Sequence, residues 1–171
     1  MGADDVLSLY LAFEAAGAPV WLMGGWGIDA LLGRQTQAHH DVDVLVGDAD
    51  LERLRLCLID LGFGLKYVWG DEARWICDDA WTSPLEQPTA FVYEHPDGRE
   101  VDVHVVRRSN GAVEPLWNVP YVFTRDSLDA VGVIDGHPVR CLSREMQRTA
   151  HTGYAVAAEH RRDLELLDEP T

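Results

Sequence analysis

The chain is poor in cysteine, and its three cysteines have no spacing typical of a metal site or a redox pair. Cys57, Cys77 and Cys141 are far apart and odd in number. This pattern excludes a disulfide framework and a zinc finger, which need paired or closely spaced cysteines. We expect buried or free thiols of a cytoplasmic protein.

Long hydrophobic runs are also missing. No apolar segment approaches the roughly 20 residues that cross a bilayer, and the first residues, MGADDVLSLY, carry no basic side chain ahead of their apolar ones. A secretory signal peptide needs such a basic region. We therefore expect a cytoplasmic protein with no membrane-spanning segment.

Basic side chains are scarce, with 14 Lys and Arg against 29 Asp and Glu and a net charge of −15. Binding to a nucleic-acid backbone needs clustered Lys and Arg, so we expect no nucleic-acid partner. A negative surface attracts cationic ligands, although general solubility or an acidic proteome explains the same balance. The length of 171 residues fits one domain of ordinary size.

The two commonest nucleotide fingerprints, Gly-x-x-x-x-Gly-Lys and Gly-x-Gly-x-x-Gly, are absent. The chain instead has Gly24-Gly25 between a predicted strand over 20–23 and a predicted helix over 26–32. Free N–H groups at the positive end of a helix bind phosphate, and glycine lets the phosphate approach the backbone closely. Gly24 and Gly25 are therefore candidate phosphate contacts.

Asp41-Val42-Asp43 lies in an apolar run that predicts a strand over 41–46. Residues two apart in a strand point to the same face, so both carboxylates project together. Their repulsion favours a bound cation, although Asp-x-Asp alone is also typical of a solvated edge. If a second strand carrying Asp102 is adjacent, three carboxylates meet and can hold two Mg²⁺ ions.

The remaining pattern predicts an α/β (α+β) fold with residues 1–142 as one domain and a helical segment over 143–171 packed on it. Further helices are predicted between Asp4 and Gly17, from Asp48 to Leu61, over 143–150 and over 155–168. Further strands are predicted over 64–69, 73–77, 89–94 and 99–106. Residues 111–142 are expected to be irregular, apart from a hairpin at Asp135-Gly136.

Several motifs resemble the antibiotic nucleotidyltransferases. They are GGWGID at 24–29, GRQT at 33–36, His39, Asp41 and Asp43, VDVH at 101–104, CLS at 141–143, Gln147, HTGY at 151–154 and Asp163. These motifs are similar to those of the lincosamide and aminoglycoside 2''-nucleotidyltransferases, small members of the polymerase-beta-like superfamily. The resemblance implies that family's fold, a mixed twisted sheet flanked by helices with a short helical C-terminal segment.

The resemblance also implies roles for single residues. Asp41, Asp43 and Asp102 would be the catalytic metal ligands, with Asp102 also the general base. Gly24, Gly25, Trp26, Arg34 and His39 would bind the nucleotide, which is ATP or another nucleoside triphosphate used with two Mg²⁺ ions. Relatives commonly have a basic residue where Gln37 stands, which puts the strength of nucleotide binding by that loop in question.

For the acceptor we predict contacts from four side chains: His104, Trp81, Glu86 and Tyr154. Each also fits a structural role, as a core residue, a helix-packing residue or solvated surface. Further candidates for an acceptor cleft are Trp69, Trp75 and Trp117, with core packing as the alternative. Asp29 either faces the site or supports it from behind.

We therefore predict a Mg²⁺-dependent nucleotidyltransferase, acting as a monomer or homodimer. It would move AMP from ATP to a hydroxyl group of a small cationic molecule, an aminoglycoside or lincosamide antibiotic, and release pyrophosphate. One alternative is nucleotidylation of a protein or RNA partner, as in toxin–antitoxin systems. Another is a non-catalytic nucleotide-sensing module, against which the three aspartates argue.

Overall fold

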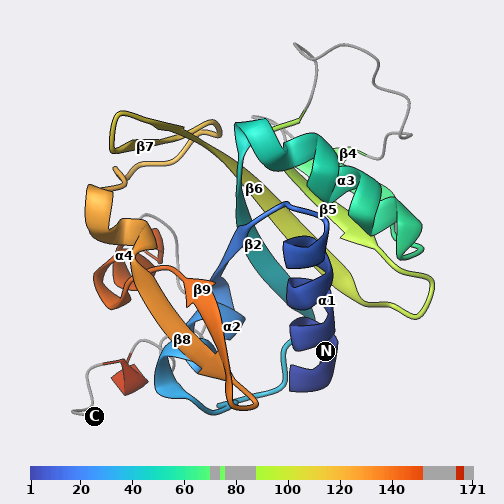
Figure 1. The fold of residues 1–171 in the computed structure, drawn as a ribbon, viewed down its shortest axis with the longest axis horizontal. Helices are drawn as coiled ribbons and strands as arrows, with labels where there is room; N and C mark the ends of the chain where they lie inside the picture. Colours follow the sequence, from blue (N-terminus) through green and yellow to red (C-terminus); the bar gives the residue numbers. More distant parts are fainter. Residues whose placement is uncertain (70–73, 76–87, 152–164, 168–171) are drawn as a thin grey trace.

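A single mixed sheet organises the molecule (Figure 1). The computed structural model describes residues 1–69, 74–75, 88–151 and 165–167. Within these residues nine strands form the sheet in the order β4-β3-β5-β6-β2-β1-β9-β8, and β7 also pairs with β6. The strands are β1 Val20–Met23, β2 Asp41–Gly47, β3 Gly64–Trp69, β4 Arg74–Trp75, β5 Ala90–Glu94, β6 Glu100–Ser109, β7 Ala112–Pro115, β8 Ala130–Ile134 and β9 His137–Cys141.

Helices cover both faces of this sheet. They are α1 Ala3–Ala15, α2 Gly24–Leu32, α3 Leu51–Asp60 and α4 Arg144–Ala150, with short 3₁₀ turns η1 Asp48–Asp50 and η2 Arg125–Leu128. Among the described residues, no helix is long and apolar enough to cross a membrane. Cys57 and Cys141 are free thiols as predicted, whereas Cys77 lies outside the described residues.

One face of the sheet is buried by α1 and α3, which lie side by side in Figure 1. The even residues of β2 and the odd residues of β6, such as Val44 and Val103, point to this face because strand side chains alternate. They pack against apolar side chains of the helices, including Phe13 and Leu54, all at most 1% exposed. Burying each such side chain stabilises the fold by about 1.5–3 kcal/mol.

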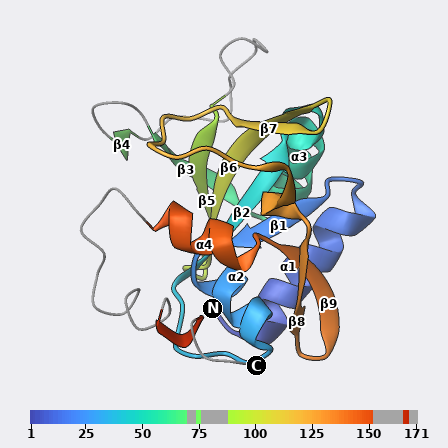
Figure 2. The same cartoon turned by 90° about the vertical axis from the view of Figure 1, so that its left-hand side faces the viewer.

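The opposite face is only partly apolar. Trp21, Leu45 and Val106 form a second cluster there with Phe123 and with Met146 of α4, the helix that lies in front of the sheet in Figure 2. Leu45 shares this face with Asp41 and Asp43, since all three are odd residues of β2. The acidic side chains therefore border an apolar cluster on this face.

Two glycines allow α2 to pack closely. A Cβ on Gly27 would lie 2.1 Å from the Gln147 amide nitrogen of α4, and a Cβ on Gly132 of β8 would lie 2.5 Å from the Ala30 backbone. Neither position has room for a side chain. Helix α2 is thereby held between α4 and the β8–β9 hairpin, with its first residues beside the ends of β1 and β2.

The mixed α/β sheet predicted from the sequence is confirmed, and so are most of its elements. The hairpin at Asp135-Gly136 is also confirmed: both residues have positive φ, 48° and 78°, as a tight two-residue turn between β8 and β9 requires. The expectation that the rest of 111–142 is irregular was wrong for β7, a four-residue strand that pairs with the end of β6. A strand this short does not show a clear side-chain alternation.

The C-terminal prediction is tested only in its first part. Helix α4 agrees with the helix predicted over 143–150. Most of the helix predicted over 155–168 lies outside the described residues. The division of the chain at residue 142 stays a prediction.

Candidate active site

Asp43 and Asp102 are direct neighbours across the parallel pair β2–β6. The same register places Asp41 beside Glu100 and Leu45 beside His104. Neighbouring residues in register project from the same face of a sheet, so the carboxylates form two adjacent rows. The structure thus places Asp102 beside Asp43, although the two residues are 59 positions apart in the sequence.

The turn after β1 lies directly on this carboxylate pair. Met23 pairs with Asp43 across β1 and β2, and Gly24 follows with a positive φ of 58°. A Cβ on Gly24 would lie 2.1 Å from the Asp43 carboxylate oxygen. Glycine is therefore required here by both conformation and contact, and it brings the start of α2 against the acidic site.

The three aspartates repel one another. Burial raises the pKa of Asp43 well above its ordinary value, and the charges of Asp41 and Asp102 raise it further. Oxygen donors on one face are what Mg²⁺ prefers, and a cation would relieve this repulsion. In the described part of the chain, however, no three acidic, His or Cys side chains are gathered as a metal site. The donors fit Mg²⁺ chemically, and closing around an ion takes a side-chain movement.

Asp102 has a partner of its own. The indole N–H of Trp69 donates to its two carboxylate oxygens, over 3.1 and 3.2 Å. His104 Nδ1 lies 3.7 Å from the same carboxylate. The predictions did not include the Trp69 bond, because it depends on which strands lie side by side.

His104 combines features of both roles considered for it. Its ring packs on Trp117 with centroids 4.9 Å apart, and burial lowers its pKa to about 4, so the imidazole is neutral at neutral pH. Its Nδ1 atom is buried and forms no hydrogen bond with the described residues. His104 is therefore packed as a core residue while it borders Asp102.

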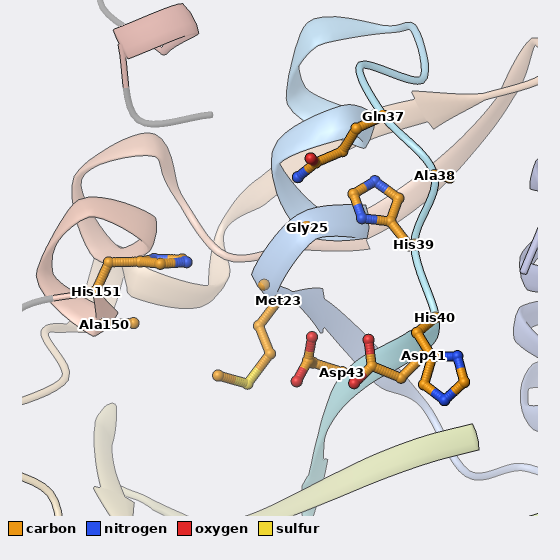
Figure 3. A pocket seen from close by; sticks show the side chains of 11 residues that line it. Met23, Gly25, Gln37, Ala38, His39, His40, Asp41, Asp43, Ala150 and His151 are labelled. Atoms are coloured by element: carbon orange, nitrogen blue, oxygen red, sulfur yellow. The ribbon is translucent and has the colours of Figure 1, made fainter. Parts of the chain in front are cut away.

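A cavity of about 390 Å³ opens over the two aspartates of β2 and the start of α2 (Figure 3). Its lining comes from the ends of β1 and α4 and from the loop before β2. The lining residues are Met23, Gly24, Gly25, Gln37, Ala38, His39, His40, Asp41, Asp43, Ala150 and His151. Among the described residues of this lining there is no lysine or arginine, so its cationic groups are limited to histidines.

Asp29 fixes one wall of this cavity. Its carboxylate, 2% exposed as a residue, accepts hydrogen bonds from Thr36 N at 3.0 Å and Thr36 Oγ1 at 2.5 Å, and it lies 2.6 Å from His39 Nε2. The His39 ring then reaches Gly25, where a Cβ would lie only 2.4 Å from it. The structure therefore favours the second role weighed for Asp29, in which it supports the site from behind by holding His39 and Thr36.

Glu100 is a fourth carboxylate that the sequence did not single out. Its burial favours a higher pKa, but hydrogen bonds from Lys66 at 2.6 Å and His40 at 3.1 Å outweigh burial and lower that pKa. Unlike Asp43, Glu100 is already neutralised by its neighbours. Only knowledge of the β2–β6 register identifies it as part of the acidic face.

The family model of the aminoglycoside-2''-adenylyltransferases matches residues 5–167, nearly the whole chain. The chain belongs to this family. It is thus an enzyme of the nucleotidyltransferase class, and the antibiotic nucleotidyltransferase family inferred from its motifs is confirmed.

Two curated relatives agree with this membership. A lincosamide resistance protein of Staphylococcus haemolyticus is 24% identical over 162 residues, covering 93% of this chain and 89% of the relative. A 2''-aminoglycoside nucleotidyltransferase of Escherichia coli is 30% identical over 142 residues, covering 78% of this chain and 63% of the relative.

Two solved structures share the fold. The lincomycin-bound lincosamide adenylyltransferase LnuA superposes with a TM-score of 0.79 and 22% identity, covering 100% of this chain and 99% of the other. ANT(2")-Ia in complex with adenylyl-2"-tobramycin gives a TM-score of 0.70 at 22% identity, with 96% and 86% covered. The nucleotidyltransferase fold predicted from the sequence is confirmed.

Only some of the residues predicted to bind the nucleotide lie at the cavity of this nucleotidyltransferase. Gly24, Gly25 and His39 line the cavity. The Trp26 side chain lies in the core, 2% exposed, with its ring 5.0 Å from His39. Arg34 is exposed and lines a separate hollow beside Asp29, because the loop turns back there.

Of the four residues predicted to contact the acceptor, only His104 is described. Trp81, Glu86 and Tyr154 lie outside the described residues. His151 lines the cavity and is held by a contact of 2.7 Å between its Nδ1 and the Gln147 carbonyl oxygen. Its only sequence signal was the HTGY motif.

Proposed function

We propose that this adenylyltransferase transfers AMP from ATP to a hydroxyl group of an aminoglycoside or lincosamide antibiotic and releases pyrophosphate. The observation that carries the proposal is the pairing of Asp43 with Asp102 directly beside Gly24 and Gly25. Carboxylates for a cation and backbone N–H groups for phosphate then lie in one place. The names of the relatives, which act on lincosamides and aminoglycosides, support the acceptor class.

Mg²⁺ would be held by Asp41, Asp43 and Asp102, and two ions are proposed because three carboxylates supply enough oxygen ligands. When bound, Mg²⁺ neutralises phosphate charge and makes the attacking hydroxyl group more acidic. Glu100 is not assigned to this set, since Lys66 and His40 already neutralise it.

The nucleotide phosphates would bind at the start of α2. Gly24 and Gly25 offer backbone N–H groups at the positive end of the helix dipole, without a side chain in the way. His39, held by Asp29, would close the wall behind them. Residues such as Gln37 contribute no positive charge to this cavity, so the bound cation carries most of the charge compensation.

Asp102 would act as the general base. Its carboxylate takes the proton of the acceptor hydroxyl as that oxygen attacks the α-phosphorus. A new oxygen–phosphorus bond forms, and the bond between the α-phosphorus and the oxygen bridging to the β-phosphate breaks. Pyrophosphate leaves with that bonding pair, and the nucleoside monophosphate stays on the acceptor.

The acceptor would approach beside His104 and Trp117, whose rings form an aromatic wall next to Asp102. Aromatic faces bind both sugar rings and ammonium groups. The charge of −15 favours a cationic acceptor. Aminoglycosides and lincosamides both carry basic amino groups on or beside sugar rings.

The test is incubation of the protein with Mg²⁺ and each of the four nucleoside triphosphates, against panels of aminoglycosides and lincosamides. We expect pyrophosphate release and a mass gain of one AMP on the antibiotic. Asp43→Asn should abolish transfer, while Asp129→Asn, which removes an exposed carboxylate away from the cavity, should not. Pyrophosphate release without a modified antibiotic would reject the acceptor class, and no nucleotide binding with Mg²⁺ would reject the proposal entirely.

A further inference from the structure

We infer that Trp69 is a positioning residue for Asp102 and forms the wall of the acceptor site next to the base; this inference rests on the proposed function. Trp69 is the last residue of β3, and β5 separates that strand from β6. Its side chain reaches across β5 to place its indole N–H 3.1 and 3.2 Å from the two Asp102 oxygens. This contact joins β3, the strand next to the edge strand β4, to the acidic centre of the sheet.

The strand register makes this reach possible. Tyr67, Val92 and Asp102 are successive partners across β3, β5 and β6, so they share one face. Trp69 lies two residues beyond Tyr67 on the same face, and the Tyr67 ring meets it edge to face at 5.2 Å. The Val92 side chain between them is short and buried, which leaves the indole room to cross.

A packing role alone does not account for this contact. Trp69 is 36% exposed, so solvent is available to its ring, yet its N–H is aimed at a carboxylate that is 8% exposed. A buried carboxylate that accepts an N–H is held in a fixed orientation. Trp69 is thus a direct polar partner of Asp102, the carboxylate that lies beside Asp43.

The same contact fixes where the acceptor must lie. A hydroxyl group that gives its proton to Asp102 has to come within about 2.6–3.2 Å of a carboxylate oxygen. Both oxygens lie within 3.2 Å of the Trp69 indole nitrogen. The sugar ring carrying that hydroxyl therefore approaches the indole closely, and the exposed part of the ring offers a face for a sugar or an ammonium group.

Trp69→Phe separates the two roles, because it removes the N–H and keeps an aromatic ring. We expect kcat to fall about ten- to hundredfold, the usual effect of losing a hydrogen bond to a charged group, while KM for ATP stays unchanged. Trp69→Leu removes the aromatic ring as well, so it should also raise KM for the acceptor about tenfold. Equal kinetics for wild type and Trp69→Phe would overturn the inference.

Trp21→Phe is the matched control. The Trp21 indole N–H donates to the Leu128 carbonyl oxygen at 2.9 Å, so this variant also loses a buried indole hydrogen bond, away from the carboxylates. It should lower the melting temperature and leave kcat within about threefold of wild type. If Trp21→Phe reduces kcat as much as Trp69→Phe, the effect is structural and the positioning role is wrong.

A binding readout that needs no turnover completes the test. In protein labelled with 5-fluorotryptophan, six ¹⁹F resonances are expected, and the one missing from Trp69→Phe belongs to Trp69. Asp102→Asn should change the chemical shift of this resonance. Addition of Mg²⁺ with a non-hydrolysable ATP analogue should also change this chemical shift in wild type, but much less in Asp102→Asn. An unchanged chemical shift of Trp69 in Asp102→Asn would show that the two residues are not paired.

The two proposals fail in different ways. A protein that transfers no nucleotide to any acceptor rejects the proposed function, while the ¹⁹F response still decides whether Trp69 and Asp102 are coupled. A Trp69→Phe variant that binds Mg²⁺ more tightly and reacts faster would show that the indole withholds Asp102 from the metal. That result would overturn the positioning role while leaving the proposed function intact.

Discussion

Gly24 lies against Asp43 so closely that a Cβ added to the glycine would be 2.1 Å from the carboxylate oxygen. The glycine φ of 58° is one that other residues rarely adopt. One residue thus couples the proposed phosphate-binding turn to the acidic centre.

Gly24→Ala should displace Asp43 or the turn and lower kcat at least a hundredfold. Gly33→Ala is a close control, because Gly33 has a similar φ of 67° but nothing within 4 Å of its added Cβ. Both variants should lose about 1–2 kcal/mol of unfolding free energy from the backbone strain, and Gly24→Ala should lose more. Steady-state kinetics and urea denaturation measure the two effects, and equal results for both variants would contradict the contact argument.

Asp43→Asn should make the protein without Mg²⁺ more stable at neutral pH, although it abolishes activity. Burial and the neighbouring aspartates raise the pKa of Asp43 in the folded state above its unfolded value, so its ionised form destabilises the fold. The penalty is present at neutral pH and disappears as pH falls through the raised pKa. At pH 7 the variant should melt at a higher temperature than wild type, by about 2–4 °C for each kcal/mol of unfolding free energy gained. The two melting temperatures should converge as the pH is lowered.

Asp29→Asn should weaken ATP binding without touching the acidic centre. The carboxylate accepts two hydrogen bonds from Thr36 and pairs with His39, and an amide cannot satisfy all three contacts as a charged acceptor. We expect KM for ATP to rise about tenfold and the acceptor KM to change little. Thr36→Val, which removes only the hydroxyl group, should give a smaller rise; an equal or larger rise would assign the effect to Thr36.

Gln37→Arg should strengthen nucleotide binding, because Gln37 lines the cavity and no described arginine or lysine does. A new cation beside the phosphates is worth about 1 kcal/mol, or fivefold in KM for ATP, and should make binding more sensitive to salt. Gln35→Arg adds the same charge two residues away, outside this cavity. If both variants tighten ATP equally, the gain reflects net charge and not the position of Gln37.

His104 should make the protein less stable in acid. Burial lowers its folded pKa to about 4 from an ordinary 6.5, so the stability contributed by the neutral ring is complete above pH 6.5 and is lost as pH falls toward 4. The loss amounts to about 1.4 kcal/mol per pH unit, up to about 3 kcal/mol. In urea denaturation across this range, His104→Phe should lose less stability than wild type, whereas His137→Gln, on the exposed β8–β9 turn, should follow the wild-type curve.

The sequence was informative wherever one local rule decides the outcome. The two-residue period of a strand puts Asp41 and Asp43 on one face, and Gly33 ends α2 with a positive φ as predicted. It was less informative in the stretch 111–142, where β7 has only four residues and β9 pairs with the distant strand β1.

Strand order was decided only by the tertiary structure. Asp102 joins Asp43 because β6 lies parallel to β2, and Trp69 joins Asp102 because its side chain crosses β5. Arg34 lines a separate hollow and not the cavity over the aspartates, which the sequence did not indicate.

The sequence by itself therefore determined the family, the mixed α/β class and the chemical groups available for nucleotidyl transfer. The tertiary structure alone decided which of those groups meet, that Glu100 is neutralised by Lys66 while Asp43 is not, and that an indole holds the proposed base. The physical reason is that periodicity and turn chemistry act between near neighbours in the chain. Contacts between residues on different strands depend on a register that the whole core selects.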